Sequence, residues 1–430
     1  MPETALAQLR IARLAGCLPT HRAFHWLHLH EPQLRRWQLE MLAIPAPPFG
    51  EGARATWFLE RFRTLGLSNV HLDEAGNALG ELLPAAPVTG HAFILLSAHL
   101  DTVFASGIDT SPAEEGTRIL GPGACDNAAG LTGLLAMIAA LRFAAIAPPR
   151  PILFAANVGE EGEGDLRGMR HLFEAGSYRG RIVAALALEG SGTAVAVTSG
   201  LGSVRLRVTF TGPGGHSWTD ADAPNPITLL GRGLVAAVDY FAAERAHDRA
   251  TQAGATQAGA TQAGAPRATF SPGQISGGTS VNSIPPSAMA LLDLRSSDRT
   301  HLDSMVEALQ NILERVVSDA NRQRSGYAPA QVRIETIGSR PAASLPRDAA
   351  LLHTLRAVDR HLGIRTELRL GSTDANLPLS IGIPAAALAA GGTGGGIHTL
   401  GEWYDPTGRE MALRRILLTL LDLAQIFVPV

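Results

Sequence analysis

The sequence predicts an α/β protein in which a mainly parallel β-sheet domain contains an inserted ferredoxin-like (α+β) domain. Two observations lead to this prediction. Short apolar runs alternate with helical patterns as far as Glu189, which is typical of parallel strands joined by covering helices. Beyond about residue 200 the predicted order becomes β-α-β-β-α-β, the split ferredoxin-like pattern. We therefore predict a discontinuous main domain at 1–199 and 339–430 and an inserted domain at 200–338.

The main domain is expected to begin with two helices over residues 32–65, separated by the Pro/Gly-rich segment IPAPPFGEG. Strand-like runs follow at 70–73, 78–83 and 93–98. The run AAGLTGLLAMIAALRFAA predicts a strongly apolar helix that begins just after Asp126. Further buried parallel strands are expected at PILFAANV, IVAALAL and IPAAALAAGG.

The inserted domain is predicted from a change in periodicity. VRLRVTF alternates as a strand does, and ITLLGRGLVAAVDYFAAERA is helical. TFSPGQISG and AMALLDLRS are expected to be strands, followed by the helix HLDSMVEALQNILERVVSDA and the strand QVRIETIG. Residues 251–265 repeat the unit TQAGA, whose period of five matches neither helix nor strand. We interpret this repeat as a low-complexity insertion between a helix and the next strand.

Composition excludes several classes of function. The 430 residues are 46% hydrophobic with a net charge of −3, so there is no basic excess for nucleic acid. All 36 basic residues are arginine, which excludes chemistry that needs a P-loop or Schiff-base lysine. The distant pair Cys17 and Cys125 argues against a disulfide framework or a cysteine-rich zinc site. Because no secretory signal and no apolar run of membrane-spanning length is evident, we expect a cytoplasmic protein.

Imidazole and carboxylate side chains follow most of the predicted parallel strands. Ligands of open α/β sheets collect beyond the carboxyl ends of the strands, and these groups are good zinc ligands. Each residue alone has an ordinary explanation, such as a surface pair, a helix cap or a solvated acidic loop. Their common position favours a metal site. The residues are His99 and Asp101 in SAHLDTVF, Asp126 in GPGACDNAAG, Glu160 and Glu161 in NVGEEGEG, Glu189 in ALALEGSG, and His398 in GGTGGGIHTLGEWYD.

Local chemistry supports this interpretation. Glu160 and Glu161 are neighbours at a strand end, where successive side chains point in opposite directions, so one can face a metal and the other its water. Glu189 ends an apolar strand, where an unpaired carboxylate is costly. The glycines before His398 lack the lysine of a phosphate-binding loop but allow close approach to a substrate. Polar residues in 371–384 are expected to support the site.

Taken together, these motifs resemble the glutamate carboxypeptidase, acetylornithine deacetylase, succinyl-diaminopimelate desuccinylase and aminoacylase family of dizinc metallopeptidases. The resemblance extends over nearly the whole chain, from Ile44 to Glu402. It implies a zinc-exopeptidase-like catalytic domain, a lid and dimerisation domain in the insertion, and two Zn²⁺ per subunit, with Co²⁺ or Mn²⁺ as alternatives. The implied roles are His99 and Glu189 on one metal, Glu161 and His398 on the other, Asp126 on both, Asp101 orienting His99, and Glu160 as general base and acid.

Three residues of the inserted domain also match positions of this family: His216 in GPGGHSW, Asn282 in SVNSIPP and Arg295 in LDLRSSD. Taken singly, His216 is explained as a turn histidine and Arg295 as a surface charge at a strand end. The resemblance implies that His216 stabilises the oxyanion across a dimer, and that Asn282 and Arg295 bind substrate. The planar fork of an arginine suits a substrate carboxylate.

The predicted function is metal-dependent hydrolysis of an amide or peptide bond in a small peptide or N-acyl amino acid with a free carboxylate. Glutamate at position 189, rather than aspartate, resembles the carboxypeptidase and deacylase branches. Two alternatives stay open. One is an aminopeptidase of the same family, which recognises a free amine, and the other is a non-catalytic binding protein that retains the fold.

Overall fold

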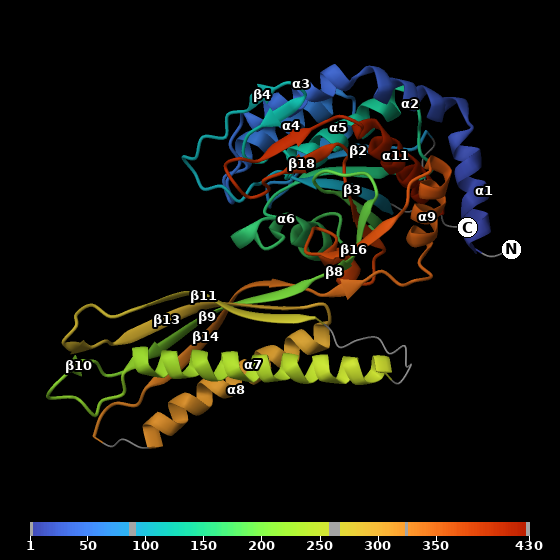
Figure 1. The fold of residues 1–430 in the computed structure, drawn as a ribbon. Helices are drawn as coiled ribbons and strands as arrows, with labels where there is room; N and C mark the ends of the chain where they lie inside the picture. The colour runs from blue at the N-terminus through green and yellow to red at the C-terminus, as the bar shows by residue number, and fades with distance from the viewer. Residues whose placement is uncertain (1–2, 86–91, 258–266, 323–325, 427–430) are drawn as a thin grey trace. The chain divides into compact units, whose positions relative to one another are not determined.

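The computed structural model divides into two compact units, which are described separately (Figure 1). Unit 1 comprises Met1–Gly200 and Ser344–Val430, and unit 2 comprises Leu201–Ala343. The sequence analysis placed the corresponding boundaries at residues 200 and 338. The structure describes residues 3–85, 92–257, 267–322 and 326–426.

Unit 1 is built on a sheet with the strand order β1-β2-β6-β3-β7-β17-β8-β15, to which β16 adds beside β8. The pairs β6–β3, β3–β7, β7–β17 and β8–β16 are parallel, which confirms the predicted mainly parallel sheet. The runs of β3 and β6 are buried at every residue, as expected for strands covered on both faces. The strands are β1 Ser68–Leu72, β2 Ala78–Leu82, β3 Phe93–His99, β6 Ile152–Asn157, β7 Ile182–Leu188, β8 Val195–Gly200, β15 Ala343–Ser344, β16 Glu367–Gly371 and β17 Ala385–Leu388.

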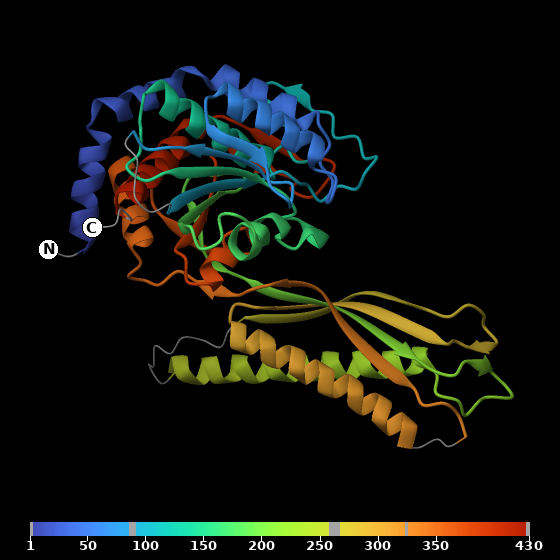
Figure 2. The same cartoon turned by 180° about the vertical axis from the view of Figure 1, so that it is seen from behind.

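Helices cover this sheet, and α5 is the most deeply buried of them. It packs on β3 and is apolar around its whole circumference, the pattern of a core helix. Helix α2 packs over α5, and α1 packs against α9 and α11 (Figures 1 and 2). The helices predicted over 32–65 are confirmed as α3 and α4. The helices of unit 1 are α1 Glu3–Ala15, α2 Leu18–Leu29, α3 Glu31–Leu42, α4 Gly52–Thr64, α5 Ala128–Phe143, α6 Arg167–Arg170, α9 Ala350–Leu362, α10 Asn376–Ser380 and α11 Arg409–Ile426, with short 3₁₀ and π turns at Gly162–Gly164 and His171–Ala175.

A second, small sheet of unit 1 was not predicted. Its order is β18-β19-β5-β4, and its pairs are antiparallel. The loop between β18 and β19 carries His398, and β5 ends shortly before Asp126, so the sheet brings these two segments together. The strands are β4 Ala113–Glu115, β5 Arg118–Leu120, β18 Thr393–Gly395 and β19 Trp403–Asp405.

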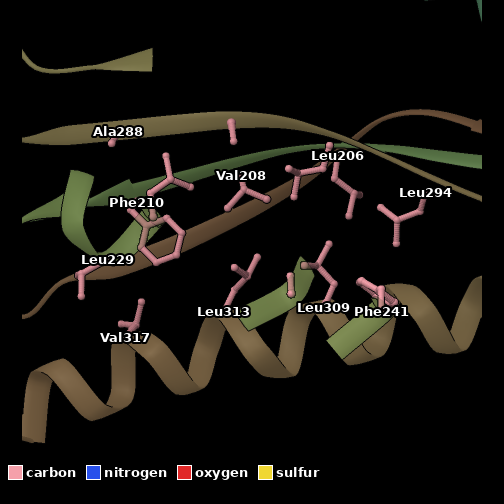
Figure 3. Close-up of a cluster of buried hydrophobic side chains, with 14 of the residues drawn as sticks. Leu206, Val208, Phe210, Leu229, Phe241, Ala288, Leu294, Leu309, Leu313 and Val317 are labelled. Atoms are coloured by element: carbon pink, nitrogen blue, oxygen red, sulfur yellow. The ribbon is translucent and has the colours of Figure 1, made fainter. Parts of the chain in front are cut away.

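The main sheet of unit 2 and its two helices follow the predicted β-α-β-β-α-β order, and this four-stranded antiparallel sheet runs β11-β13-β9-β14. The short strands β10 and β12, which pair with each other, were not predicted. Alternate residues of β13 are buried, as expected for a sheet that has one face on a core. Figure 3 shows that core, where Val208 and Phe210 of β9 face Leu309 and Leu313 of α8. The elements are β9 Gly202–Thr211, β10 Gly215–His216, α7 Pro226–Gln257, β11 Ala268–Gly277, β12 Ser283–Ile284, β13 Ser287–Ser296, α8 Arg299–Arg322 and β14 Gln331–Arg340.

The interpretation of the repeat as a separate insertion was partly wrong. Helix α7 continues to Gln257, so residues 251–257 extend the helix, and 258–265 lie outside the described residues. These residues continue an existing helix, so they do not meet the cost of nucleation. The repeat period was therefore a poor guide to where the helix ends.

One segment among the described residues, Pro226–His247 of α7, is long and apolar enough to cross a membrane by length and composition. The sequence analysis found no such segment. A core helix of a globular domain passes the same test, and Leu229, Leu230 and Phe241 of this helix are buried in the core of unit 2.

Candidate metal centre

The predicted ligands come together at one edge of the sheet of unit 1. His99 is the last residue of β3, Glu161 follows its neighbour β6, and Glu189 directly follows its other neighbour β7. Parallel neighbouring strands end at the same edge, so their terminal residues converge. Asp126 and His398 reach this edge from the start of α5 and from the loop after β18.

His99, Asp126 and Glu189 form the first group of potential ligands. Nε2 of the buried His99 lies 3.1 Å from Oδ1 of Asp126 and 3.2 Å from Oε1 of Glu189. One donor atom of each residue lies within 4.8 Å of the others. The second oxygen of Glu189, Oε2, is buried and has no hydrogen-bond partner among the described residues. An unsatisfied carboxylate oxygen in such a position fits a bound cation.

Asp126, Glu161 and His398 form the second group. Nε2 of His398 lies 3.0 Å from Oδ2 of Asp126 and 3.0 Å from Oε1 of Glu161. The two oxygens of Asp126 therefore face two different histidines, one in each group. His398 has a φ of 64° and a half-exposed ring, which leaves the second group more open than the first.

The electrostatics of the two groups also favour cations. Hydrogen bonds with Asp126 and Glu161 raise the pKa of His398 to about 10. Burial lowers the pKa of His99, but the charge of Glu189 and hydrogen bonds to neighbouring carboxylates raise it well above its usual value. Burial raises the pKa of Glu189 to about 7. The carboxylates around the two histidines thus stabilise positive charge at this position.

Asp101 fixes both the first histidine and the glutamate pair. Its carboxylate accepts hydrogen bonds from the backbone N–H of Glu160 (3.0 Å) and of Glu161 (2.7 Å). Its backbone oxygen lies 3.0 Å from Nδ1 of His99, whereas its carboxylate is 3.6 Å away. The sequence analysis assigned Asp101 to orient His99. In the structure the backbone oxygen of Asp101 lies nearest to the His99 ring, and its carboxylate also holds the backbone N–H groups of the glutamate pair.

Glu160 lies in the same cluster. His99, Glu160 and Glu161 each offer a ligand atom within 4.8 Å of the others, and all three residues are buried. The glutamate pair is therefore not a solvated surface loop. Asp374, in the predicted supporting segment 371–384, accepts a hydrogen bond at 2.8 Å from Asn157 at the end of β6, and its charge contributes to raising the pKa of Glu189.

Sequence reasoning missed Glu402, which organises the loop of Asp126. Its buried carboxylate accepts three backbone N–H bonds, from Gly123 at 2.9 Å, Cys125 at 2.8 Å and Asp126 at 2.7 Å. Because Glu402 lies four residues after His398, it ties the two ligand-bearing loops together. A single glutamate beside a turn has no local pattern that separates it from a surface residue.

The helix cap at this site is Asn127 rather than Asp126. Oδ1 of Asn127 accepts hydrogen bonds from the N–H groups of Gly130 at 3.1 Å and Gly190 at 3.2 Å. Its Nδ2 donates to the backbone oxygen of Leu188 at 2.9 Å. The start of α5 is thereby joined to the end of β7. Asp126 is left with both oxygens directed at the histidines.

The three predicted residues of unit 2 do not form one group within that unit. His216 pairs with Ser283 across the β10–β12 ladder, and Asn282 is adjacent, its backbone oxygen accepting from Ser217 N at 3.1 Å. Arg295 lies near the opposite end of β13 from Ser287. Its Nε donates to Oδ2 of Asp293 at 2.7 Å, so its guanidinium already has a carboxylate partner.

Solved structures similar to this chain include several peptidases. The aminopeptidase PepT from Bacillus cereus is 18% identical with a TM-score of 0.68, over 91% of this chain and 98% of that one. A tripeptidase from Staphylococcus aureus is 20% identical with a TM-score of 0.68, over 92% and 99%. The YXEP protein of Bacillus subtilis, described as a dinuclear metal binding peptidase, is 13% identical with a TM-score of 0.65, over 92% and 98%. At these identities the similarity shows the fold.

No curated protein sequence matches this chain significantly. A family profile does match, that of "Peptidase family M20/M25/M40", over residues 95–424. The match spans well over half of the chain and includes every residue of the two ligand groups and Glu160. The chain therefore belongs to peptidase family M20/M25/M40.

Proposed function

We propose that this protein is a two-metal hydrolase that cleaves an amide or peptide bond in a small peptide or N-acyl amino acid with a free carboxylate. The observation that supports this most strongly is the position of Asp126, with one oxygen toward His99 and the other toward His398. A carboxylate placed between two ligand groups suits the short metal separation of two-metal sites.

The residues present fit the expected metal. His99, Asp126 and Glu189 would hold one ion, and Asp126, Glu161 and His398 the other. Imidazole and carboxylate ligands suit zinc, and also cobalt or manganese, whereas a purely oxygen site would favour magnesium or calcium. Bound zinc would supply polarisation of the substrate carbonyl and a water with a pKa of about 7.

Glu160 is the residue proposed to move the proton. The backbone N–H of Glu160 donates a hydrogen bond to Asp101 at 3.0 Å, and the side chain of Glu160 is buried in the ligand cluster. In this position the carboxylate accepts a proton from the attacking water and donates it to the leaving nitrogen, acting as base and then as acid. A binding protein would have no use for such a group, which argues against the non-catalytic alternative.

The aminopeptidase alternative remains the main competitor. It gains support from the similar structures described as an aminopeptidase and a tripeptidase. The ion pair between Arg295 and Asp293 also weakens the case for Arg295 as a free carboxylate receptor. Glutamate at position 189 supports a substrate with a free carboxylate, because it resembles the residue of the carboxypeptidase and deacylase branches.

A homodimer formed through unit 2 is part of the proposal. Ile227, Val235 and Val238 of α7 are 42%, 62% and 42% exposed, and their spacing places them on one helix face. The adjacent strand β11 is an edge strand of its sheet, with most of its residues exposed. An apolar helix face beside an open strand edge favours association with a second copy.

Removal of the metals tests the central claim. Chelation is expected to abolish hydrolysis while circular dichroism shows a folded protein, because two apolar cores hold the fold without metal. Metal analysis of the native protein should approach two ions per chain. Turnover is measured on a mixed panel of N-acyl amino acids, dipeptides and tripeptides. Absence of bound metal after growth in zinc-replete medium would contradict the proposal.

Arg295→Ala separates the two classes of substrate. If Arg295 binds a substrate carboxylate, the variant should raise KM for free acids and have much less effect on their amides. A charge-assisted hydrogen bond contributes about 1.5–3 kcal/mol, so the change in selectivity should be at least about tenfold. Arg205→Ala, which removes the other arginine near Asp293, serves as the control. Equal effects of Arg295→Ala on acids and amides would favour the aminopeptidase.

A further inference from the structure

Phe49 combines two unusual properties. The residue is 63% exposed, and its backbone has a φ of 64°. It is the third residue of a turn that Gly50 closes by donating its N–H to the backbone oxygen of Pro47 at 2.8 Å. Glycine is the usual residue for a left-handed φ at this position of a turn, because a Cβ is strained there. Neither the backbone conformation of the turn nor burial in a core therefore explains a phenylalanine at this position.

The turn is attached to the strand end that carries the metal-ligand cluster. The backbone oxygen of Ala46 accepts a hydrogen bond at 3.0 Å from the N–H of Thr102, the residue after Asp101. The buried Arg54 donates to the backbone oxygens of Ile44 at 2.6 Å and Leu100 at 2.8 Å. These bonds on both sides of Asp101 fix the start of the turn at the edge of the site.

The side chain of Arg167 contacts the Phe49 ring. The guanidinium carbon lies 5.1 Å from the ring centroid, within the range of a cation–π contact. Bonds to Oε1 of Glu51 at 2.8 Å and to the backbone oxygen of Ala75 at 2.6 Å hold that guanidinium in place. Arg167 is also in contact with Gly159, the residue before Glu160, and donates its N–H to the backbone oxygen of Gly159 at 3.2 Å.

We propose that the Phe49 ring is a specificity-determining wall on the Glu160 side of the site, which contacts an apolar or aromatic group next to the scissile amide. The inference rests on the proposed hydrolase function. Strained residues are retained where function requires them, and a ring held by a turn and a guanidinium loses little freedom when a substrate binds. A large apolar side chain of the substrate gains binding free energy by burying area against such a ring, whereas a glycine or alanine buries little.

The test compares Phe49→Gly with Phe49→Leu on a substrate series that differs only in the side chain beside the scissile bond. For leucine- and phenylalanine-bearing substrates, Phe49→Gly should lower kcat/KM at least about tenfold, mainly through KM, since pocket contacts of this size are worth about 10–200-fold. Glycine- and alanine-bearing substrates should change much less, and Phe49→Leu should retain part of the preference. Metal content should be unchanged, and Phe49→Gly should melt no lower than Phe49→Leu, because glycine adopts this φ without strain.

Phe143→Ala is the matched control, because Phe143 is 47% exposed and has its own arginine partner, Arg22, 5.9 Å from the ring. It lies at the end of α5 opposite to Asp126 and should leave the substrate preference unchanged. An equal loss on all substrates, or a lower melting temperature and metal content in Phe49→Gly, would make the ring a structural cover for Arg167 and overturn the inference. If the wild-type protein cleaves no member of the series, the proposed function itself fails, and this inference with it.

Discussion

Glu160→Gln is expected to reduce kcat by about 10²–10⁴-fold, the usual contribution of general acid–base catalysis. The loss should lie toward the upper end, because one carboxylate serves two successive proton transfers in the proposed mechanism. Glutamine has almost the same shape, and the backbone N–H of residue 160 keeps its bond to Asp101. The fold and the metal content should therefore persist. Steady-state kinetics with parallel metal analysis measure the effect.

Glu163→Gln provides the control for this substitution. Glu163 is an exposed carboxylate in the same acidic loop, so its variant makes the same change of charge nearby without removing a member of the cluster. It should retain nearly full activity. Near-normal kcat in a fully metallated Glu160→Gln protein would remove Glu160 from the mechanism, and equal losses in both variants would point to a general electrostatic effect of the loop.

The parallel sheet could be predicted because each of its central strands is a short, continuous apolar run bounded by loop residues. This holds for β3, β6, β7 and β17, which pair as expected. The small sheet that supports His398 could not be predicted. Its strands are three residues long, and Thr393–Gly395 lies within a glycine-rich segment that has neither alternation nor apolar character. Such strands exist because of their tertiary partners.

The candidate ligands could be recognised because most of them follow the end of a predicted parallel strand, and this position places the carboxylate or imidazole at one edge of the sheet. His99 and Glu189 are predictable in this way, and the structure places them together. The residues that hold the ligands are different. Glu402 acts through three backbone N–H groups that are more than 270 residues away in sequence, and no local pattern records such a bond. Asn127 was hidden because it directly follows Asp126, itself a good candidate for a helix cap.

Sequence periodicity predicted some elements of unit 2 correctly and failed for the repeat. The alternation of β13 and the apolar stripe of α8 predicted both elements, because each has one face on the core shown in Figure 3. The sequence of residues 251–257 has no apolar stripe, and its five-residue period suggested an irregular insertion. Their helical state in the structure follows from continuity with α7.

The second large effect concerns His216, and mixed dimers provide its test. If His216 stabilises the oxyanion in the partner's site, His216→Ala should lower kcat by about 10²–10³-fold, as expected for the loss of one oxyanion donor. The Glu160→Gln homodimer should be similarly inactive. In a dimer of one chain of each kind, the site with an intact Glu160 receives His216 from the Glu160→Gln chain and is complete. The other site lacks both groups.

Equal, random mixing of the two inactive proteins should therefore restore about one quarter of the wild-type activity, since half of the dimers are mixed and each has one complete site. The measurement is kcat per chain after co-refolding or co-expression, with the mixed dimer verified by two different affinity tags. Mixing either variant with itself is the control and should restore nothing. If His216 acts only within its own chain, both sites of every mixed dimer remain defective, and activity stays at the level of the parents. That result, in a verified mixed dimer, would leave His216 as a turn histidine whose N–H donates to Asp220 and whose ring accepts from Trp218.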